Sequence, residues 1–316
     1  MTLCLRVKNE ILLAQTTYRA NGKLLLTGEY LVLHGAKAIA LPLNVGQQMV
    51  VSQMKNSSKV QWQARFQGKI WFECVLNSDD LSVWETSDPL KSDVVGNLFK
   101  AIKELNSEFK LTSGIKLETT LESNPEWGFG SSSTLVSLLA QWSGVDPFRL
   151  NKMVFQGSGF DIACATANGP IFYTRNQPSE PVLLDYPFAD QLFLVYSGQK
   201  KGTAREVRSF LKERPVAEQQ IADMNALSEE FAVCSNQEDF NRLIEIHESM
   251  IGKIIDQIPV KAQFFPDFDG AIKSLGAWGG DFWLVSSALP FQQVKGYFVN
   301  KGLDTVFKWS DWILKK

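Results

Sequence analysis

Residues 124–134 read Asn-Pro-Glu-Trp-Gly-Phe-Gly-Ser-Ser-Ser-Thr, and the apolar run LVSLLAQW follows directly. Gly128 and Gly130 allow the backbone to come close to a ligand and to point successive N–H groups inward. The serines that follow can cap a helix, whose free amides and positive dipole end favour phosphate. Their hydroxyl oxygens also suit magnesium. This stretch predicts either a phosphate-binding loop or a plain serine-capped core helix.

Two further glycine-containing segments carry charged side chains. Residues 20–35 read ANGKLLLTGEYLVLHG, with Lys23 and Glu29 at the ends of a short buried strand. In the segment GSGFDIACATANGP, a flexible turn delivers Asp161 to the start of a helix of small residues. Each segment also has an ordinary interpretation, a turn glycine beside a solvated lysine and a helix-capping aspartate.

Other enzyme classes lack the residues that they need. The chain contains no GxxxxGK[ST] loop and no dinucleotide-binding GxGxxG. A serine hydrolase would need a GxSxG context and one of only two histidines, His34 and His247. We expect His34 in a loop and His247 on a helix face, and their spacing does not support a metal site.

Composition excludes several classes of protein. The 316 residues are 45% apolar and 21% charged, which suits about two globular domains. The 32 Lys and Arg against 34 Asp and Glu give no global attraction to nucleic acid or to an anionic membrane. No run is apolar enough to span a bilayer, and the first residues lack a signal-peptide core. We therefore expect a cytoplasmic protein with no nucleic-acid partner and no membrane, whose cysteines are buried free thiols: Cys4, Cys74, Cys164 and Cys234.

Hydrophobic patterns predict a mixture of strands and helices. Strands are expected over 23–27, 38–43, 47–53, 60–66, 69–74, 115–121, 192–196, 282–286 and 304–308. Helices are expected over 92–106, after the glycine-rich loop to 143, from Pro147, and over 203–213, 217–234, 238–257 and 287–301. Because strands and helices do not alternate strictly, the pattern indicates α+β layering in two domains, with a boundary within 177–187.

In combination and in this order, the glycine-containing segments resemble the GHMP kinase superfamily, which includes galactokinase, homoserine kinase, mevalonate kinase and phosphomevalonate kinase. ANGKLLLTGEYLVLHG is similar to the first family motif, APGKxxLxGEYxVLxG, and NPEWGFGSSS to the second, PxxxGxGSS. SLGAWGGDFWLV is similar to the C-terminal GAGGGD motif. GSGFDIACATANGPIFY resembles the catalytic-aspartate region of phosphomevalonate kinases, and SGQKKGTAREV the substrate-side segment.

The resemblance implies an α+β, two-domain GHMP kinase fold. An N-terminal ATP-binding domain over residues 1–183 would contain a left-handed βαβ unit, and a ferredoxin-like domain would cover 184–316. ATP and Mg²⁺ would be the cofactors, and the γ-phosphoryl group would pass to a small-molecule substrate, mevalonate or phosphomevalonate, in isoprenoid precursor synthesis. The chain would be a monomer or a homodimer. There are two alternatives. The chain would be a non-catalytic ligand-binding or regulatory protein, or a kinase for a sugar, homoserine or another alcohol.

The resemblance also implies roles for individual residues. Asp161 would accept the proton of the attacking group, and Lys23 beside it would favour the ionised form. Ser132 matches the magnesium ligand. The positions that would bind ATP are Pro125, Gly128, Phe129, Gly130, Ser131, Ser132 and Ser133. The positions that would contact the substrate are Glu29, Tyr30, His34, Ser158, Thr203, Gly276 and Gly279.

The sequence departs from the family pattern at three places. Asn21 replaces the proline of the first motif, and Trp278 replaces a glycine of the third. The indole of Trp278 would either narrow the cleft or fill the interdomain floor, and we expect Trp127, Phe129 and Phe282 to help shape the cleft. The stretch DPFRLNKMVFQ over 146–156 lacks the glutamate with which mevalonate and homoserine kinases bind magnesium.

Overall fold

The computed structural model describes residues 12–54, 57, 59–111, 114–198, 215–276, 278 and 280–315, with side chains from residue 15 onward. Contacts group the chain into two compact units. The first unit comprises Met1–Ala20, Gly46–Asn124 and Ser131–Gln156, and the second Asn21–Val45, Pro125–Gly130 and Gly157–Lys316. The domain boundary expected between residues 183 and 184 stays a prediction.

The first unit contains a sheet with the strand order β5-β4-β3-β6-β2. Its strands are β3 (Lys59–Phe66), β4 (Lys69–Asn77), β5 (Val83–Thr86), β6 (Ile115–Leu121) and the later part of β2 (Ala38–Met54). β3 runs parallel to β6, and the other neighbours are antiparallel. A parallel pair needs a crossover, which here includes α1 (Pro89–Leu105). The hand of this βαβ connection stays a prediction.

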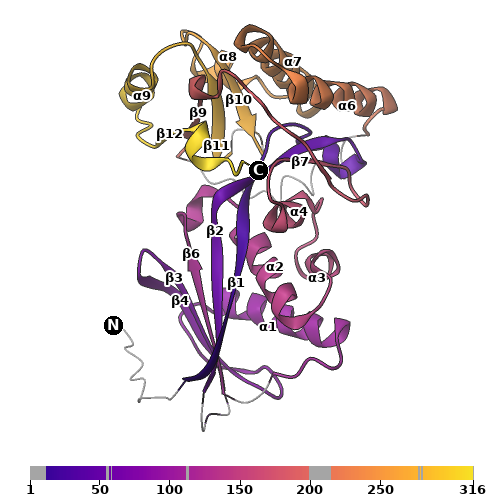
Figure 1. Cartoon of the computed structure of the whole chain (residues 1–316), viewed down its shortest axis with the longest axis vertical. Helices are drawn as coiled ribbons and strands as arrows, with labels where there is room; N and C mark the ends of the chain where they lie inside the picture. Colours follow the sequence, from indigo (N-terminus) through magenta and orange to yellow (C-terminus); the bar gives the residue numbers. More distant parts are fainter. Residues whose placement is uncertain are drawn as a thin grey trace. The chain divides into compact units, whose positions relative to one another are not determined.

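Three helices pack together in the first unit (Figure 1). They are α1, α2 (Ser131–Ser143) and α3 (Pro147–Val154). The side chain of Asp88 caps α1 by accepting from the Lys91 amide at 3.2 Å, and Asp146 caps α3 by accepting from the Arg149 amide at 2.8 Å. A proline follows each cap at the first helical position, as its fixed φ favours.

In the second unit, the chain enters on the last residues of β1 (Leu12–Leu25) and turns through η1 (Leu31–His34) into β2. The beginning of β2 pairs antiparallel with β7 (Ile171–Tyr173), which in turn pairs with β8 (Glu180–Pro181). The short helix α4 (Phe160–Thr166) precedes β7 and packs against it. The segment Pro125–Trp127 forms the single turn η2.

A second sheet, entirely antiparallel, has the strand order β10-β11-β9-β12. Its strands are β9 (Leu192–Tyr196), β10 (Ala271–Leu275), β11 (Phe282–Ser286) and β12 (Val306–Lys308). Numbered along the chain, this order is 4-1-3-2, with helices between β9 and β10 and between β11 and β12, which is the ferredoxin-like connectivity. The connecting elements are η3 (Ala189–Gln191), α6 (Glu218–Val233), α7 (Gln237–Ile255), α8 (Val260–Phe264), α9 (Phe291–Asn300) and α10 (Trp309–Trp312).

Most of the predicted elements are present, with corrections at their ends. The two strands expected over 38–43 and 47–53 are one continuous strand, β2, and the strand expected from Lys23 begins at Leu12. The helix expected over 287–301, α9, begins at Phe291 rather than at Ser287, because Pro290 cannot continue a helix that starts before it. β5, β7, β8 and β10 were not predicted, and the helix expected over 203–213 lies outside the described residues.

Cys74, Cys164 and Cys234 are buried free thiols, as predicted, and Cys4 lies outside the described residues. Among the described helices, none has both the length and the apolar composition of a membrane-spanning segment.

Candidate functional site

In the second unit, Lys23 near the end of β1 is bound to the glycine-rich segment. Its ammonium donates to the carbonyl of Gly128 at 2.9 Å, and its backbone N–H donates to the carbonyl of Phe129 at 3.0 Å. The ammonium also lies 5.5 Å from the centre of the Phe160 ring. Because one residue makes both bonds, the first and second motifs are held together at Lys23.

The shape of the glycine-rich segment depends on its two glycines. Gly128 and Gly130 have φ values of 66° and 95°, in the left-handed region that glycine adopts readily. A Cβ atom at Gly128 would overlap the carboxylate of Asp281, which belongs to the third motif. The three glycine-containing motifs therefore meet here through Lys23, Gly128 and Asp281.

Aromatic side chains of the core pack against the glycine-rich segment. The Phe129 ring is 5% exposed and stacks on Phe282 with centroids 4.7 Å apart. Trp127 contacts Phe307 and Trp312 at centroid distances of 5.1 and 5.6 Å. These rings are core side chains, so the Phe129 side chain packs in the interior of the second unit.

Asp161 lies in the first turn of α4, directly after Gly159, whose φ is 93°. It is half-buried, and its Oδ1 accepts from the Ile162 amide at 3.1 Å. Burial raises the pKa of Asp161 above 3.8, and the positive charge of Lys23 opposes this rise. Lys23 acts on Asp161 through its charge, without a hydrogen bond between the two described side chains.

Tyr173 is a further residue near Asp161, and it was not predicted from the sequence. Its hydroxyl donates to the carbonyl of Ser158 at 2.6 Å, which ties β7 to the turn before α4. Burial and the negative charge of Asp161 raise the pKa of Tyr173 to about 12, so the phenol stays protonated at neutral pH. The alternation of Ile171 and Tyr173 on one face of a short strand was the only signal in the sequence.

The amino end of α2 lies in the first unit and carries the three predicted serines. Ser131 is half-buried, Ser132 is exposed and Ser133 is buried, so the accessible hydroxyl is that of Ser132. The first turn contains no acidic residue that would repel an anion. Among the described residues no group of three or more His, Cys, Asp or Glu suits a metal ion. Magnesium keeps several waters when a protein binds it, so it needs few protein ligands. A hydroxyl such as that of Ser132, with one carboxylate, is a chemically suitable set of ligands for it.

Glu29 occupies a buried cluster of charges in the second unit. Its Oε1 accepts from the Lys273 ammonium at 2.5 Å, and its Oε2 lies 2.9 Å from Nε2 of His247. Burial opposes ionisation, but Lys273 and His247 together lower the pKa of Glu29 below 4.5. Burial and Lys273 lower the pKa of His247 below 6.5. The carboxylate of Glu29 is thus bound by protein groups that were not predicted.

Tyr30 and Trp278 lie next to this cluster. The Trp278 amide donates to the Tyr30 hydroxyl at 3.0 Å, and the indole is 5% exposed in a core with Leu31, Met224 and Ile251. The Trp278 indole therefore fills the interior of the second unit, and its expected place at a cleft or at the interdomain floor stays a prediction.

The remaining predicted substrate residues are dispersed. His34 is half-buried in η1, where burial and then the nearby charge of Arg175 lower its pKa. Ser158 and Gly276 are half-buried, and a Cβ at Gly276 would meet nothing within 4 Å. Thr203 and Gly279 lie outside the described residues.

Similar folds are found among solved structures of small-molecule kinases. Mevalonate kinase from Methanococcus jannaschii is 15% identical with a TM-score of 0.70, over 96% of this chain and 99% of that one. Phosphomevalonate kinase from Streptococcus pneumoniae, in complex with phosphomevalonate and AMPPNP, is 14% identical with a TM-score of 0.67, over 93% and 99%. Galactokinase from Lactococcus lactis, complexed with galactose, is 14% identical with a TM-score of 0.64, over 95% and 93%. No family model and no curated protein sequence matches the chain. The predicted α+β fold is confirmed.

Proposed function

We propose that this chain, which has the fold of the GHMP kinases, is an ATP-dependent kinase that phosphorylates mevalonate or phosphomevalonate. The observation that carries the proposal is Lys23, bound to the carbonyl of Gly128 and acting on Asp161 from within that fold. A lysine held on a glycine-rich segment beside a carboxylate suits phosphoryl transfer, which needs alignment and charge neutralisation more than covalent help.

In this proposal the glycine-rich segment and Ser132 serve the nucleotide. The positive φ values of Gly128 and Gly130 turn the backbone of this segment, whose N–H groups would bind phosphate oxygens in this proposal. The exposed hydroxyl of Ser132 would hold Mg²⁺, together with oxygens of ATP, in place of the glutamate that is missing from residues 146–156. When bound, magnesium neutralises the charge on the phosphates.

Asp161 would take the proton of the attacking hydroxyl or phosphate. A carboxylate can do so only when it is ionised, and its burial works against ionisation. Lys23 opposes this effect by its positive charge, and the hydrogen bond to Gly128 keeps that charge in place. Lys23 would therefore have two tasks, orienting the glycine-rich segment and favouring the ionised form of Asp161.

A panel of acceptors tests this function. Release of ADP would be measured with the full chain, ATP and Mg²⁺, and with mevalonate, phosphomevalonate, galactose and homoserine in separate reactions. We expect turnover with mevalonate or phosphomevalonate and at least ~100-fold less with the other two, since groups built to pair with one acceptor reject another strongly. Turnover with galactose or homoserine alone would assign the chain to another alcohol. The cytoplasmic location and the monomeric or homodimeric state belong to the same proposal.

A non-catalytic ligand-binding protein is the second candidate function. The raised pKa of Asp161 and the missing glutamate favour it, because both weaken the groups that transfer would need. It predicts that calorimetry detects nucleotide binding while no acceptor in the panel releases ADP.

A further inference from the structure

Tyr30 has a backbone conformation that a tyrosine rarely adopts. Its φ is 62° and its ψ is −47°, and the Leu31 N–H donates to the carbonyl of Glu29 at 2.7 Å. These angles and this bond define a three-residue γ-turn with positive φ, a form that is rare and strained. A strained residue persists only where its surroundings hold it, and such residues cluster at functional sites. The contacts that hold Tyr30 therefore bear on function.

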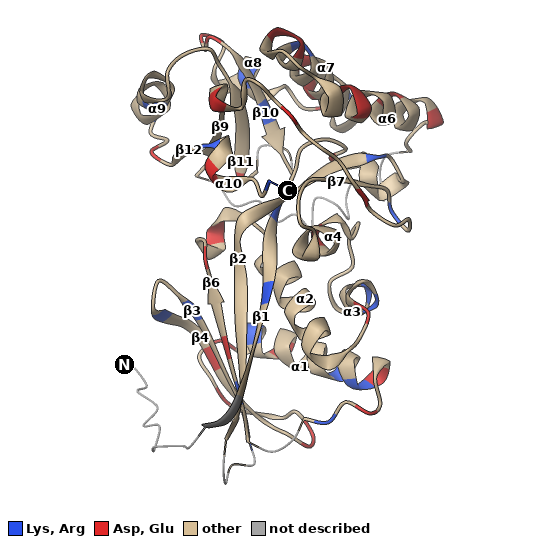
Figure 2. Ribbon diagram, viewed as in Figure 1, with Lys and Arg blue, Asp and Glu red and all other residues tan. Residues whose placement is uncertain are grey.

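Charged residues of β10 and α7 hold one side of this turn (Figure 2). The Glu29 carboxylate is 2% exposed, accepts from the Lys273 ammonium of β10 and lies 2.9 Å from Nε2 of His247 on α7. A buried carboxylate that lost such partners would be costly. The first residue of the turn is therefore fixed to β10 and α7.

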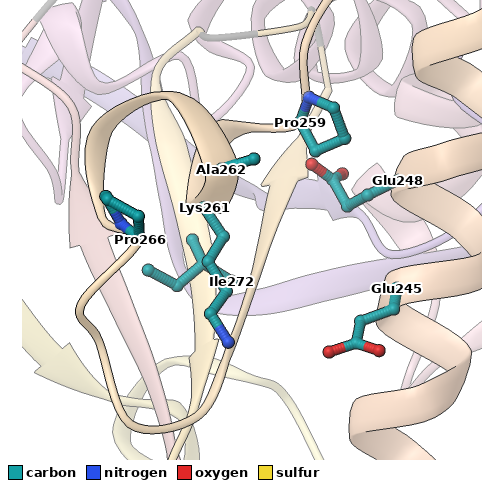
Figure 3. Close-up of a pocket in the computed structure, with 7 residues that line it drawn as sticks. All are labelled: Glu245, Glu248, Pro259, Lys261, Ala262, Pro266 and Ile272. Carbon is teal, nitrogen blue, oxygen red and sulfur yellow. The ribbon is translucent and has the colours of Figure 1, made fainter.

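β10 is itself fixed to two helices. Figure 3 shows Glu248 on α7 beside Pro259, which precedes α8. The Glu248 carboxylate accepts from the amides of Ser274 on β10 and Val260 on α8. A shift of Glu29 would therefore have to move a strand that α7 and α8 hold in place.

Trp278 holds the other side of the turn. Its amide donates to the Tyr30 hydroxyl at 3.0 Å, and its indole packs in a cluster with Leu31, Met224 and Ile251. Leu31 is fully buried, so the residue after Tyr30 is fixed by the same cluster. The GAGGGD pattern has a glycine in place of Trp278, and a glycine could supply the amide but not the indole.

Tyr30 also packs against a second cluster, which belongs to the surroundings of Asp161. This cluster contains Cys164 of α4 and Tyr173 of β7. α4 carries Asp161 in its first turn, and Tyr173 is close enough for the charge of Asp161 to raise its pKa. The half-buried Tyr30 thus connects the cluster of Trp278 with the residues around Asp161.

We propose that Trp278 is a positioning residue for the acceptor, because it holds Tyr30 in the strained turn and against the residues around Asp161. This inference rests on the proposed function, in which Asp161 takes the proton of the acceptor. Without the indole the turn can relax, and only the molecules that keep the strained turn bind the acceptor well. The apparent affinity for the acceptor falls by that fraction. The bond from Lys23 to Gly128, which serves the nucleotide, stays in place.

The test compares Trp278→Leu with Trp283→Leu. Trp283 is 6% exposed, close to the 5% of Trp278, and it packs in a separate cluster of the second unit. Both substitutions remove an indole from the core, so both should lower the temperature of thermal unfolding. Tyr30→Phe is a milder variant, which keeps the ring and removes only the hydroxyl that accepts from the Trp278 amide.

Two quantities are measured on the full chain: the hydrogen-exchange rate of the Leu31 amide, and the KM of the acceptor, with kcat and the KM of ATP alongside. We expect Trp278→Leu to raise the exchange rate and the acceptor KM by at least ~10-fold each, with kcat and the KM of ATP within about threefold of the parent. A tenfold rise is about 1.4 kcal/mol, which lies within the strain of one such residue. Tyr30→Phe should raise both quantities by at least ~3-fold, as the loss of one hydrogen bond predicts. Trp283→Leu should leave both within about twofold of the parent.

A merely structural role of Trp278 would give a different result. Equal effects of Trp278→Leu and Trp283→Leu on the acceptor KM, an unchanged Leu31 exchange rate, or a fall in kcat at constant KM would overturn the inference. If Trp278→Leu does not fold, Tyr30→Phe decides by the same criteria. A parent chain that releases no ADP with any acceptor contradicts the proposed function, whereas an active parent whose variants keep the acceptor KM contradicts only this inference.

Discussion

At the residue scale, the proposed role of Asp161 as the base separates a kinase from a protein that only binds its ligands. Asparagine at this position is of the same size but cannot accept the proton. We expect Asp161→Asn to lower turnover by at least ~100-fold, the usual contribution of a general base, with nucleotide affinity unchanged within about threefold. Steady-state ADP release and calorimetric titration of ATP measure the two quantities.

Asp146→Asn is the matched control for this substitution. Asp146 caps α3, and asparagine caps a helix about as well as aspartate. Turnover of the control should stay at the parent level. If Asp161→Asn also keeps the parent turnover, Asp161 is not the base.

Gly128 combines an unusual backbone conformation with a close neighbour. Alanine there would be strained at a φ of 66°, and its Cβ would overlap the Asp281 carboxylate. We expect Gly128→Ala to lower the free energy of unfolding by more than ~1 kcal/mol, the cost of the backbone strain alone, and to weaken ATP binding. Chemical denaturation and calorimetry measure both.

Gly68→Ala is the control that measures the cost of backbone strain without a steric overlap. Its φ is 75°, but nothing lies within 4 Å of its Cβ position. Gly68→Ala should therefore show only the cost of strain, with unchanged ATP affinity. Equal destabilisation by the two substitutions would mean that Asp281 moves aside without cost.

At the scale of elements, Lys273 on β10 and His247 on α7 hold Glu29, which follows β1. Lys273→Met leaves the Glu29 carboxylate buried beside a neutral side chain. Removing one partner of a buried ion pair costs about 3–5 kcal/mol, and we expect a loss of unfolding free energy of this size at pH 7. Lys253→Met is the control, because Lys253 is exposed on α7, and it should cost at most about 1 kcal/mol. A similar loss for both variants would show that the buried pair contributes no more than an exposed lysine.

Glu248 makes the stability of the chain depend on pH. Its pKa is raised to about 8 in the folded state from the ordinary 4.5 of a glutamate, so the folded chain holds a proton that the unfolded chain releases. This contribution is complete below pH 4.5 and is lost as the pH rises through 8, by at most about 5 kcal/mol. The lowered pKa of His247 gives the opposite trend below 6.5, so the informative quantity is the difference between the parent chain and Glu248→Gln. Urea denaturation from pH 4 to 9 should show this difference falling with pH, and a flat difference contradicts the assignment.

The elements that could be predicted from the sequence are those whose run of apolar residues is uninterrupted. β9 and β11 are continuous apolar runs, and their predicted bounds agree with the structure. β10 escaped prediction because Lys273 and Ser274 interrupt its apolar pattern, although both are buried. β2 was divided in two because Asn44 and Gly46, in the gap between the two expected strands, are typical of turns.

At the scale of the whole molecule, the part of the candidate site that follows from the sequence is the part encoded in short motifs. Lys23, Gly128 and Asp161 each stand in a recognisable local pattern. Tyr173, His247 and Lys273 do not, because their roles arise only where strands and helices distant along the chain meet. No local pattern tells a buried lysine that pairs with Glu29 from an exposed one.

The glycine-rich segment also depends on the end of the described chain. Trp312 on α10 packs against Trp127 and Phe129, and the neighbouring Ile313 pairs with Leu43. We expect Trp312→Ala to lower the unfolding free energy by about 3 kcal/mol and to weaken ATP binding, because the segment loses its support. Thermal unfolding and calorimetry test this.

Trp84→Ala is the matched control, because Trp84 is 66% exposed on β5, where Lys59 covers its ring. It should change stability by no more than about 1 kcal/mol and leave ATP affinity unchanged. Unchanged ATP affinity in Trp312→Ala would show that the backbone alone maintains the segment.

The packing of Trp312 on Trp127 also has a consequence for synthesis on the ribosome. A chain that has been translated only as far as α9 already contains every motif of the proposed site, but Phe307 and Trp312 are not yet available to Trp127. Such a nascent chain exposes an aromatic surface that chaperones recognise, since exposed apolar surface drives association during folding. The affinity for nucleotide should therefore appear only after Phe307 and Trp312 have left the exit tunnel.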